Sequence, residues 1–180
     1  MTIHLRKMYV DSRFGQLHLH TAFPSSGGFD ELTPLLCAAP PSQTGRVFRP
    51  LLKDLGRDRS VYAPDLPGAG ESDGPDHAPT VADQAAAFID LVDSLRLKQV
   101  DIFGYQGGSL AAIEFALARP GQVRRVLLLG VPASDGGYQV GERLPLLREA
   151  RRIDLTTANA QVFESGSAEI VQITREFLDR

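Results

Sequence analysis

Residues 100–109 read Val-Asp-Ile-Phe-Gly-Tyr-Gln-Gly-Gly-Ser. The apolar start is typical of a buried β-strand, and the run that follows, Leu110–Arg119, has the composition of a helix. Between them, Gly104 and Gly108 flank Gln106, which predicts a tight turn from strand to helix. A carboxamide has no group that a neighbouring base could convert into a nucleophile. The stretch therefore predicts a sharp turn that presents Gln106 without covalent chemistry through that side chain.

A second glycine-rich segment strengthens this reading. Residues 65–72 read Asp-Leu-Pro-Gly-Ala-Gly-Glu-Ser and follow an apolar run, Ser60–Pro64. Together the two segments resemble the α/β-hydrolase superfamily, in which a D-x-x-G-x-G-x-S loop precedes a nucleophile elbow with Ser, Cys or Asp at its centre. The resemblance runs from about Met8 to the C-terminus and implies an α/β-hydrolase fold whose nucleophile position holds Gln106.

The order of the other elements supports an α/β fold. The expected strands are Lys7–Asp11, Gln16–Ala22, Pro34–Ala38, Ser60–Pro64 and Val123–Val131, and the expected helices are Gly45–Leu55 and one that starts at Thr80 with Asp83 as its capping partner. Alternation of strands and helices predicts a mostly parallel, twisted sheet between two helical layers. We expect a single domain, 1–180, with a three-layer α/β/α sandwich of about seven strands and an antiparallel pair at its N-terminal edge.

One segment of the chain is short. Residues 132–140 separate the strand Val123–Val131 from an expected helix, Gly141–Ala150. The resemblance implies that a cap, one further strand and its helix have been lost here. The strand Arg152–Leu155 should then pair directly beside Val126–Leu129.

The resemblance also implies that the catalytic groups of the family are missing. The loop that normally supplies an oxyanion donor reads Cys-Ala-Ala-Pro-Pro-Ser at residues 37–42, so the donor position falls at Ala39 or on a proline such as Pro40, which has no N–H. The position of the late base histidine falls on Ala160. The four histidines are His4, His18, His20 and His77, and none follows Gln106.

Several residues remain as weak catalytic candidates. These are Ser109, Asp135 and His77, with a plainer interpretation of Ser109 as a helix cap and of His77 as a solvated loop residue. We expect His18 and His20, at alternate positions of the N-terminal hairpin, to lie on the surface. The other chemically notable side chains have structural interpretations: Cys37 as a buried thiol and Asp65 as a stabiliser of its own glycine turn.

Composition narrows the classes of function. A net charge of −3 argues against a nucleic-acid surface, and no run approaches the roughly 20 apolar residues that a membrane span needs. A single cysteine allows no internal disulfide and favours a reducing, cytoplasmic location, as does the lack of a signal-peptide run at the start. No metal site or cofactor motif is predicted.

Three functions remain open. The first is a non-catalytic protein with a pocket for a small organic acid, formed by Gln106, Gly107, Gly108, Ala39, Pro40 and Ala160. The second is an esterase-like hydrolase acting on a carboxylic ester through Ser109, His77 and Asp135. The third is a module that forms a homodimer, or binds a partner, through the face without a cap, around Tyr138, Val140 and Leu144.

Overall fold

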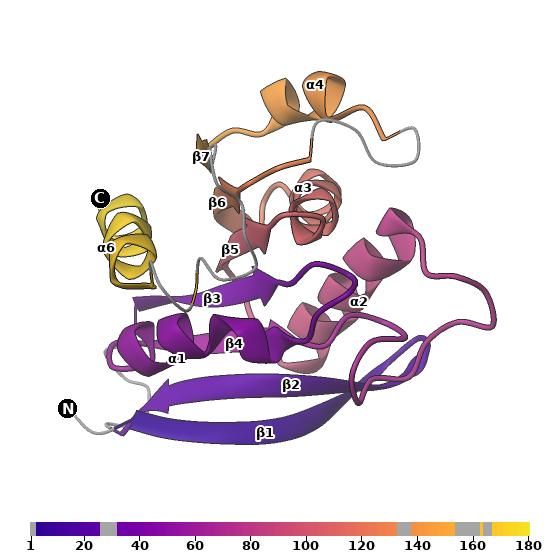
Figure 1. Cartoon of the computed structure of the whole chain (residues 1–180), viewed down its shortest axis with the longest axis horizontal. Helices are drawn as coiled ribbons and strands as arrows, with labels where there is room; N and C mark the ends of the chain where they lie inside the picture. The colour runs from indigo at the N-terminus through magenta and orange to yellow at the C-terminus, as the bar shows by residue number, and fades with distance from the viewer. Residues whose placement is uncertain (1–2, 26–31, 133–137, 154–162, 164–166) are drawn as a thin grey trace.

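The computed structural model describes residues 3–25, 32–132, 138–153, 163 and 167–180. Its centre is a seven-stranded sheet with the order β1-β2-β4-β3-β5-β6-β7 (Figure 1). The elements are β1 Ile3–Ser12, β2 Gly15–Pro24, β3 Leu32–Ala38, the 3-10 helix η1 Gly45–Phe48, α1 Arg49–Leu55, β4 Arg59–Pro64, α2 Val81–Ser94, β5 Val100–Tyr105, α3 Gly108–Ala118, β6 Val123–Leu129, α4 Val140–Arg143, the 3-10 helix η2 Leu144–Leu146, β7 Ala150–Ile153 and α6 Ser167–Leu178.

The sheet is mixed, as the sequence predicts. β1 and β2 form an antiparallel hairpin at one edge, and β2 pairs antiparallel with β4. From β4 onward all pairings are parallel. Parallel strands bring their carboxyl ends to the same edge of a sheet, so the turns that follow β3, β4 and β5 meet there. These turns carry the segments that the sequence singled out.

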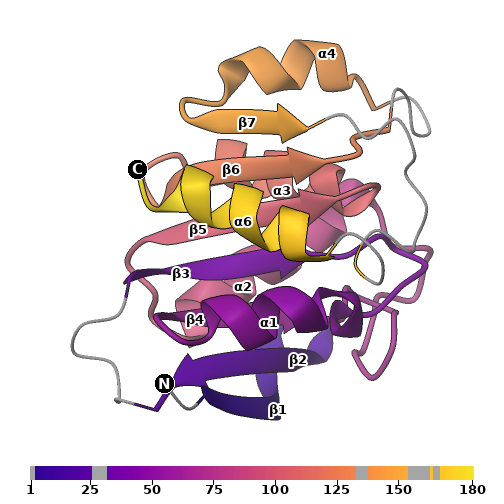
Figure 2. The ribbon, with the colours of Figure 1, turned by 60° about the vertical axis from the view of Figure 1, so that its left-hand side comes forward.

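Helices cover both faces of the sheet, which confirms the three layers. Figure 2 shows α1 and α6 in front of the strands, with α2 and α3 behind them. Each layer has its own apolar core. One core joins α2 and α3 to the sheet through side chains such as Phe88 and Phe115, and the other joins α1 and α6 through side chains such as Phe48 and Phe177.

The predicted start of α2 is confirmed in detail. The Thr80 hydroxyl accepts a hydrogen bond from the Asp83 N–H at 3.2 Å, and the Asp83 carboxylate accepts one from the Thr80 N–H at 2.9 Å. Two of the otherwise unpaired N–H groups at this helix start are therefore satisfied reciprocally.

The last part of the sheet confirms one prediction and corrects another. β7 pairs parallel with β6, with Val126 opposite Ala150 and Leu129 opposite Ile153, as the loss of a strand requires. The single helix expected over Gly141–Ala150 is wrong: α4 and η2 together end at Leu146, and Ala150 already belongs to β7. Pro145 explains the early end, because proline has no N–H with which to continue an α-helix.

Candidate functional site

The turn after β5 has the strained geometry of an elbow. Gln106 adopts a φ of 46°, in the left-handed region that costs a non-glycine residue about 1–2 kcal/mol. Its N–H donates to the carbonyl of Leu129 on β6 at 2.8 Å, which fixes the turn against the neighbouring strand. The residue is half-buried. The chain therefore holds a carboxamide where this turn would aim a nucleophile.

Two glycines allow the turn because the helix lies very close to the sheet. A Cβ on Gly104 would lie 2.6 Å from the Cα of Ser109, and a Cβ on Gly108 would lie 2.2 Å from the carbonyl oxygen of Ala38. Both distances are far below a normal contact, so only glycine fits at either position. The Gly-x-Gln-x-Gly spacing is thus explained by backbone packing, independently of any chemistry.

The loop after β3 lies against the elbow, as the resemblance implied. Ala39 and Pro40 are buried, and a Cβ on Gly107 would come within 3.0 Å of the Pro41 side chain. The Pro40 carbonyl accepts a hydrogen bond from the Gln43 N–H at 2.9 Å, which closes a tight turn. Four of the expected pocket residues, Ala39, Pro40, Gly107 and Gly108, therefore belong to adjoining segments.

Ser109 does not have the role of a cap. The N-cap of α3 is Gly107, and no side chain caps this helix. The Ser109 side chain is fully buried, and its hydroxyl has no hydrogen-bond partner among the described residues. The hydroxyl is therefore closed to solvent in this structure.

His77 lies apart from Ser109. Its ring is exposed, its Nδ1 donates to the Ala78 carbonyl at 3.1 Å, and the same atom lies 3.9 Å from the Asp83 carboxylate at the start of α2. These contacts place His77 in a solvated loop. Asp135 and Ala160, the other two residues expected at the site, lie outside the described residues.

The face expected to stay open after loss of the cap is partly filled. Val140 is buried in the core of the α2–α3 face, and Tyr138 and Leu144 pack against the same core. The Tyr138 hydroxyl also donates to Glu114 on α3 at 2.8 Å. The apolar side chain that remains exposed in this region is Leu146, at 62%.

A buried cluster next to the glycine loop was missed by the sequence interpretation. His18 is 1% exposed, and its Nδ1 lies 2.9 Å from an Asp65 carboxylate oxygen, which makes the expectation of a surface residue wrong. The reason is that β2 is the inner strand of the hairpin, covered by β4 on the side away from β1. His20 is half-buried, and its Nε2 lies 3.6 Å from the other Asp65 oxygen.

Asp65 stabilises its own loop, as predicted, and also contacts β2 and the start of η1. Its carboxylate accepts hydrogen bonds from the N–H of Gly45 at 2.8 Å and of Glu71 at 3.2 Å, in addition to the His18 contact. A single residue therefore joins β2, the start of η1 and the glycine loop.

The same three side chains are the candidate metal ligands of the described chain. One donor atom from each of His18, His20 and Asp65 lies within 4.8 Å of the others. Both Asp65 oxygens already accept hydrogen bonds, and the cations Lys7 and Arg46 lie close enough to depress the pKa of His20. These charges oppose a bound cation, so we interpret the cluster as a structural network.

Burial shifts the pKa of two further groups, His20 on β2 and Cys37 on β3. Burial, the largest effect, lowers the pKa of His20, and the nearby cations act in the same direction against the Asp65 carboxylate. Burial also raises the pKa of the Cys37 thiol far above its ordinary value, which keeps that cysteine protonated and unreactive.

None of the described helices combines the length and apolar character that crossing a bilayer requires.

The strand order, the elbow and the glycine loop define the class of protein as one with an α/β-hydrolase fold. The chain belongs to the alpha/beta hydrolase family, whose model matches residues 17–179. It is 36% identical over 140 residues to a 2-hydroxymuconate semialdehyde hydrolase of Pseudomonas putida, an alignment that covers 71% of this chain and 48% of the relative. The chain spans less than half the length of the curated relatives that it matches.

Solved structures give the same fold. An N-acyl homoserine lactonase in complex with N-hexanoyl homoserine matches with a TM-score of 0.62 and 26% identity, over 72% of this chain and 46% of that one. A hydrolase from Pseudomonas aeruginosa PA01 matches with a TM-score of 0.82 over 97% of this chain and 99% of that one, at 13% identity. The second likeness concerns the fold alone, and it spans a chain of almost the same extent.

Proposed function

We propose that this chain is a non-catalytic member of the family that binds a small carboxylate at the elbow. The observation that carries the proposal is Gln106, a side chain without a nucleophilic atom held at a φ of 46° where the fold places a nucleophile. Ser109, the candidate for a substitute nucleophile, does not favour catalysis. The Ser109 hydroxyl is buried, and it has no partner among the described residues that could take its proton.

The chemistry of the elbow favours an anion. α3 starts at Gly108 without a side-chain cap, and the first N–H groups of a helix carry the positive end of its dipole. The half-buried Gln106 amide adds a further polar group beside them. The names of the relatives point the same way, since 2-hydroxymuconate semialdehyde and N-hexanoyl homoserine both carry a carboxylate.

Binding is tested by titrating hexanoate into isotopically labelled protein and following the amide signals by NMR. We expect the Gly107 and Gly108 amides to shift first and to saturate at low millimolar ligand. Hexanol, which has the same alkyl chain without the charge, is the matched control and should leave these two signals nearly unchanged. Absence of shifts with hexanoate at about 10 mM would contradict the proposed ligand class.

Catalysis is tested separately with p-nitrophenyl acetate and butyrate. We expect no turnover above the buffer blank. Turnover that disappears in Ser109→Ala would instead establish the second candidate function, an esterase with an atypical site.

Self-association has one observation in its favour. Among the described strands, β7 pairs only with β6, so its outer edge can accept another strand, and Leu146 is exposed nearby. The strand carries Arg151 and Arg152, however, and two copies paired edge to edge would bring these charges together. We therefore rank this candidate below carboxylate binding. Light scattering that shows a stable dimer at micromolar concentration would reverse the order.

A further inference from the structure

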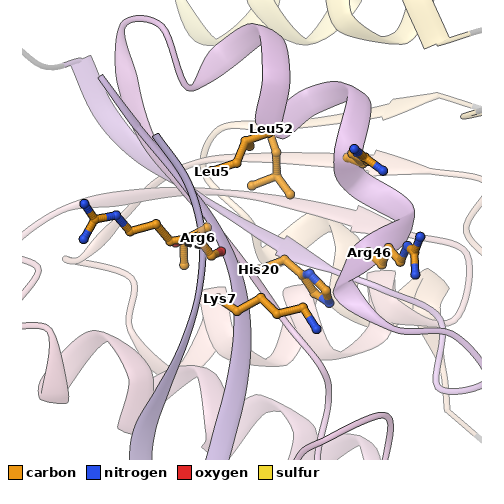
Figure 3. Close-up of a pocket in the computed structure, with 8 residues that line it drawn as sticks. Leu5, Arg6, Lys7, His20, Arg46 and Leu52 are labelled. Atoms are coloured by element: carbon orange, nitrogen blue, oxygen red, sulfur yellow. Dashed lines mark hydrogen bonds between the residues drawn. The ribbon is translucent and has the colours of Figure 1, made fainter. Parts of the chain in front are cut away.

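A cavity lies away from the elbow, between the N-terminal hairpin and the start of α1. It has a volume of about 370 Å³ and is lined by Leu5, Arg6, Lys7, His20, Thr21, Arg46, Arg49 and Leu52 (Figure 3). Such a volume is at the lower end of the range for small-molecule pockets. None of its lining residues belongs to the elbow or to the loop after β3, so the cavity is independent of the carboxylate site proposed above.

The charges around this cavity have one sign. Its lining includes Lys7, His20, Arg46 and Arg49 and contains no acidic residue. Arg6 adds little, because its side chain extends to the other side of β1 in Figure 3, as the alternation of a strand requires. The lining is unusual in a chain whose net charge is −3.

Two of the cations have no carboxylate partner in the described part of the chain. Arg13, Arg124 and Arg175 illustrate the common pattern, each in an ion pair with an aspartate. Arg46 and Arg49 form no such pair with any described residue, and they stand three positions apart on η1 and the start of α1, on neighbouring turns of the helix. Lys7 is only weakly engaged, in an exposed pair with Glu71 at 3.2 Å.

The opposite wall is apolar. Leu5 is 44% exposed, whereas Leu52, which faces it from α1, is only 3% exposed and contributes a small apolar area. A ligand that used the whole cavity would need an anionic group for the arginines and a small apolar group for the leucines. Guanidinium groups bind phosphate with paired hydrogen bonds, and several cations match a dianion better than a monoanion.

We propose that this cavity is a binding site for a small phosphate monoester, with the phosphate on Arg46, Arg49, Lys7 and His20 and the organic group against Leu5 and Leu52. His20 is the inner wall of the site, held in place by Asp65 at 3.6 Å. Among the described residues, Asp65 faces His18 and His20, and Glu71 faces Lys7, which places two carboxylates next to the site.

Phenyl phosphate is a suitable probe because it combines a dianion with a small ring. We expect saturable shifts of the Thr21, Val47 and Leu52 amides in NMR titrations, and weaker binding at higher salt. Benzoate, a monoanion with the same ring, should bind at least about 5-fold more weakly, and inorganic phosphate should also bind more weakly because it has no ring to cover Leu5. Equal affinity for benzoate would overturn the assignment of a phosphate site.

Variants locate the site. Arg46→Gln with Arg49→Gln should weaken phenyl phosphate binding by about 10-fold or more. Arg57→Gln is the matched control, an exposed arginine just after α1 that does not line the cavity, and it should change the affinity by less than about 2-fold. All three arginines are exposed, and circular dichroism checks that each variant is folded. Unchanged affinity in the folded double variant would contradict the proposal.

His20 supplies a readout that a non-specific surface effect would not give. A phosphate bound beside the imidazole favours its protonated form, so phenyl phosphate should raise the pKa of His20 from its depressed position. The phenyl phosphate titration also distinguishes the cavity from the elbow. Shifts confined to the Gly107 and Gly108 amides would place the anion at the elbow and would overturn the phosphate site in the cavity. Failure of hexanoate to bind at the elbow would leave the phosphate site in the cavity unaffected.

Discussion

At the scale of single residues, Gln106 shows that the backbone of the elbow can form without a nucleophilic side chain. The backbone of this residue is held by the bond to Leu129 and by the glycines on either side, so the turn does not depend on which side chain it carries. A change of side chain at Gln106 should therefore leave the turn intact and alter only its chemistry.

Gln106→Ser tests this separation. We expect the variant to fold normally and to hydrolyse p-nitrophenyl acetate only slightly, at most within the roughly 10³–10⁴-fold over water that persists when triads are dismantled. The reason is that a serine needs a base, and none of the histidines of this chain follows the elbow in sequence. Gln106→Ala is the control. A burst of p-nitrophenol from the serine variant would show that a base already lies in place.

The residues that could be predicted from the sequence are those whose role is local. Gly104, Gly108 and Asp65 lie in short motifs whose spacing marks them, although the packing that requires Gly108 involves Ala38 on β3. The burial of His18 depends on which strand lies beside β2, and β4 is far along the chain. Hydrophobic alternation within β2 carries no information about that neighbour. The Arg46–Arg49 cavity was missed for the same reason.

At the scale of elements, the elbow requires the start of α3 to lie very close to the sheet. The fully buried run from Gly108 to Ile113 packs on β5 and on the end of β3, and glycine at its start allows the backbones to meet. Apolar runs predicted the central strands and this helix, and alternation predicted the N-terminal pair, although β1 starts at Ile3 and not at the expected Lys7. The end of α4 was not, because Pro145 lies inside a run whose composition otherwise suits a helix.

Gly108→Ala should be strongly destabilising. Its added Cβ would lie 2.2 Å from the Ala38 carbonyl oxygen and 2.5 Å from that of Ala39, both on rigid backbone. We expect the free energy of unfolding to fall by about 2–3 kcal/mol in urea denaturation. Gly141→Ala is the control, since a Cβ there meets nothing within 4 Å and helix propensity favours alanine. Equal effects of the two substitutions would contradict the close approach.

At the scale of the whole molecule, the pH dependence of stability should carry a contribution from His20. Burial and neighbouring cations lower its pKa below the ordinary value of 6.5, so the unfolded chain takes up a proton at a higher pH than the folded protein does. The stability contributed by the neutral, buried ring is fully present above 6.5 and is lost as the pH falls through the folded pKa.

His20→Gln should remove this contribution. Urea denaturation at about pH 7.5 and about pH 5 should show a smaller loss of stability on acidification in the variant than in the wild type. His4→Gln, at an exposed position of β1, is the matched control and should change the profile less than His20→Gln does. A His20→Gln profile that coincides with the wild type would show that another group dominates the acid response.

The strand order also dictates when the sheet can be completed during synthesis of the chain. β3 comes between β2 and β4 in sequence, but in the sheet β4 lies beside β2. One edge of β3 pairs with β4, and the other edge pairs with β5. Until residues 100–105 have left the ribosome, the edge of β3 around Leu36 and Cys37 has no strand to cover it. Uncovered apolar edges are where chains associate wrongly. Once β5, the strand before the elbow, has been synthesised, it can pair with β3 and cover this edge.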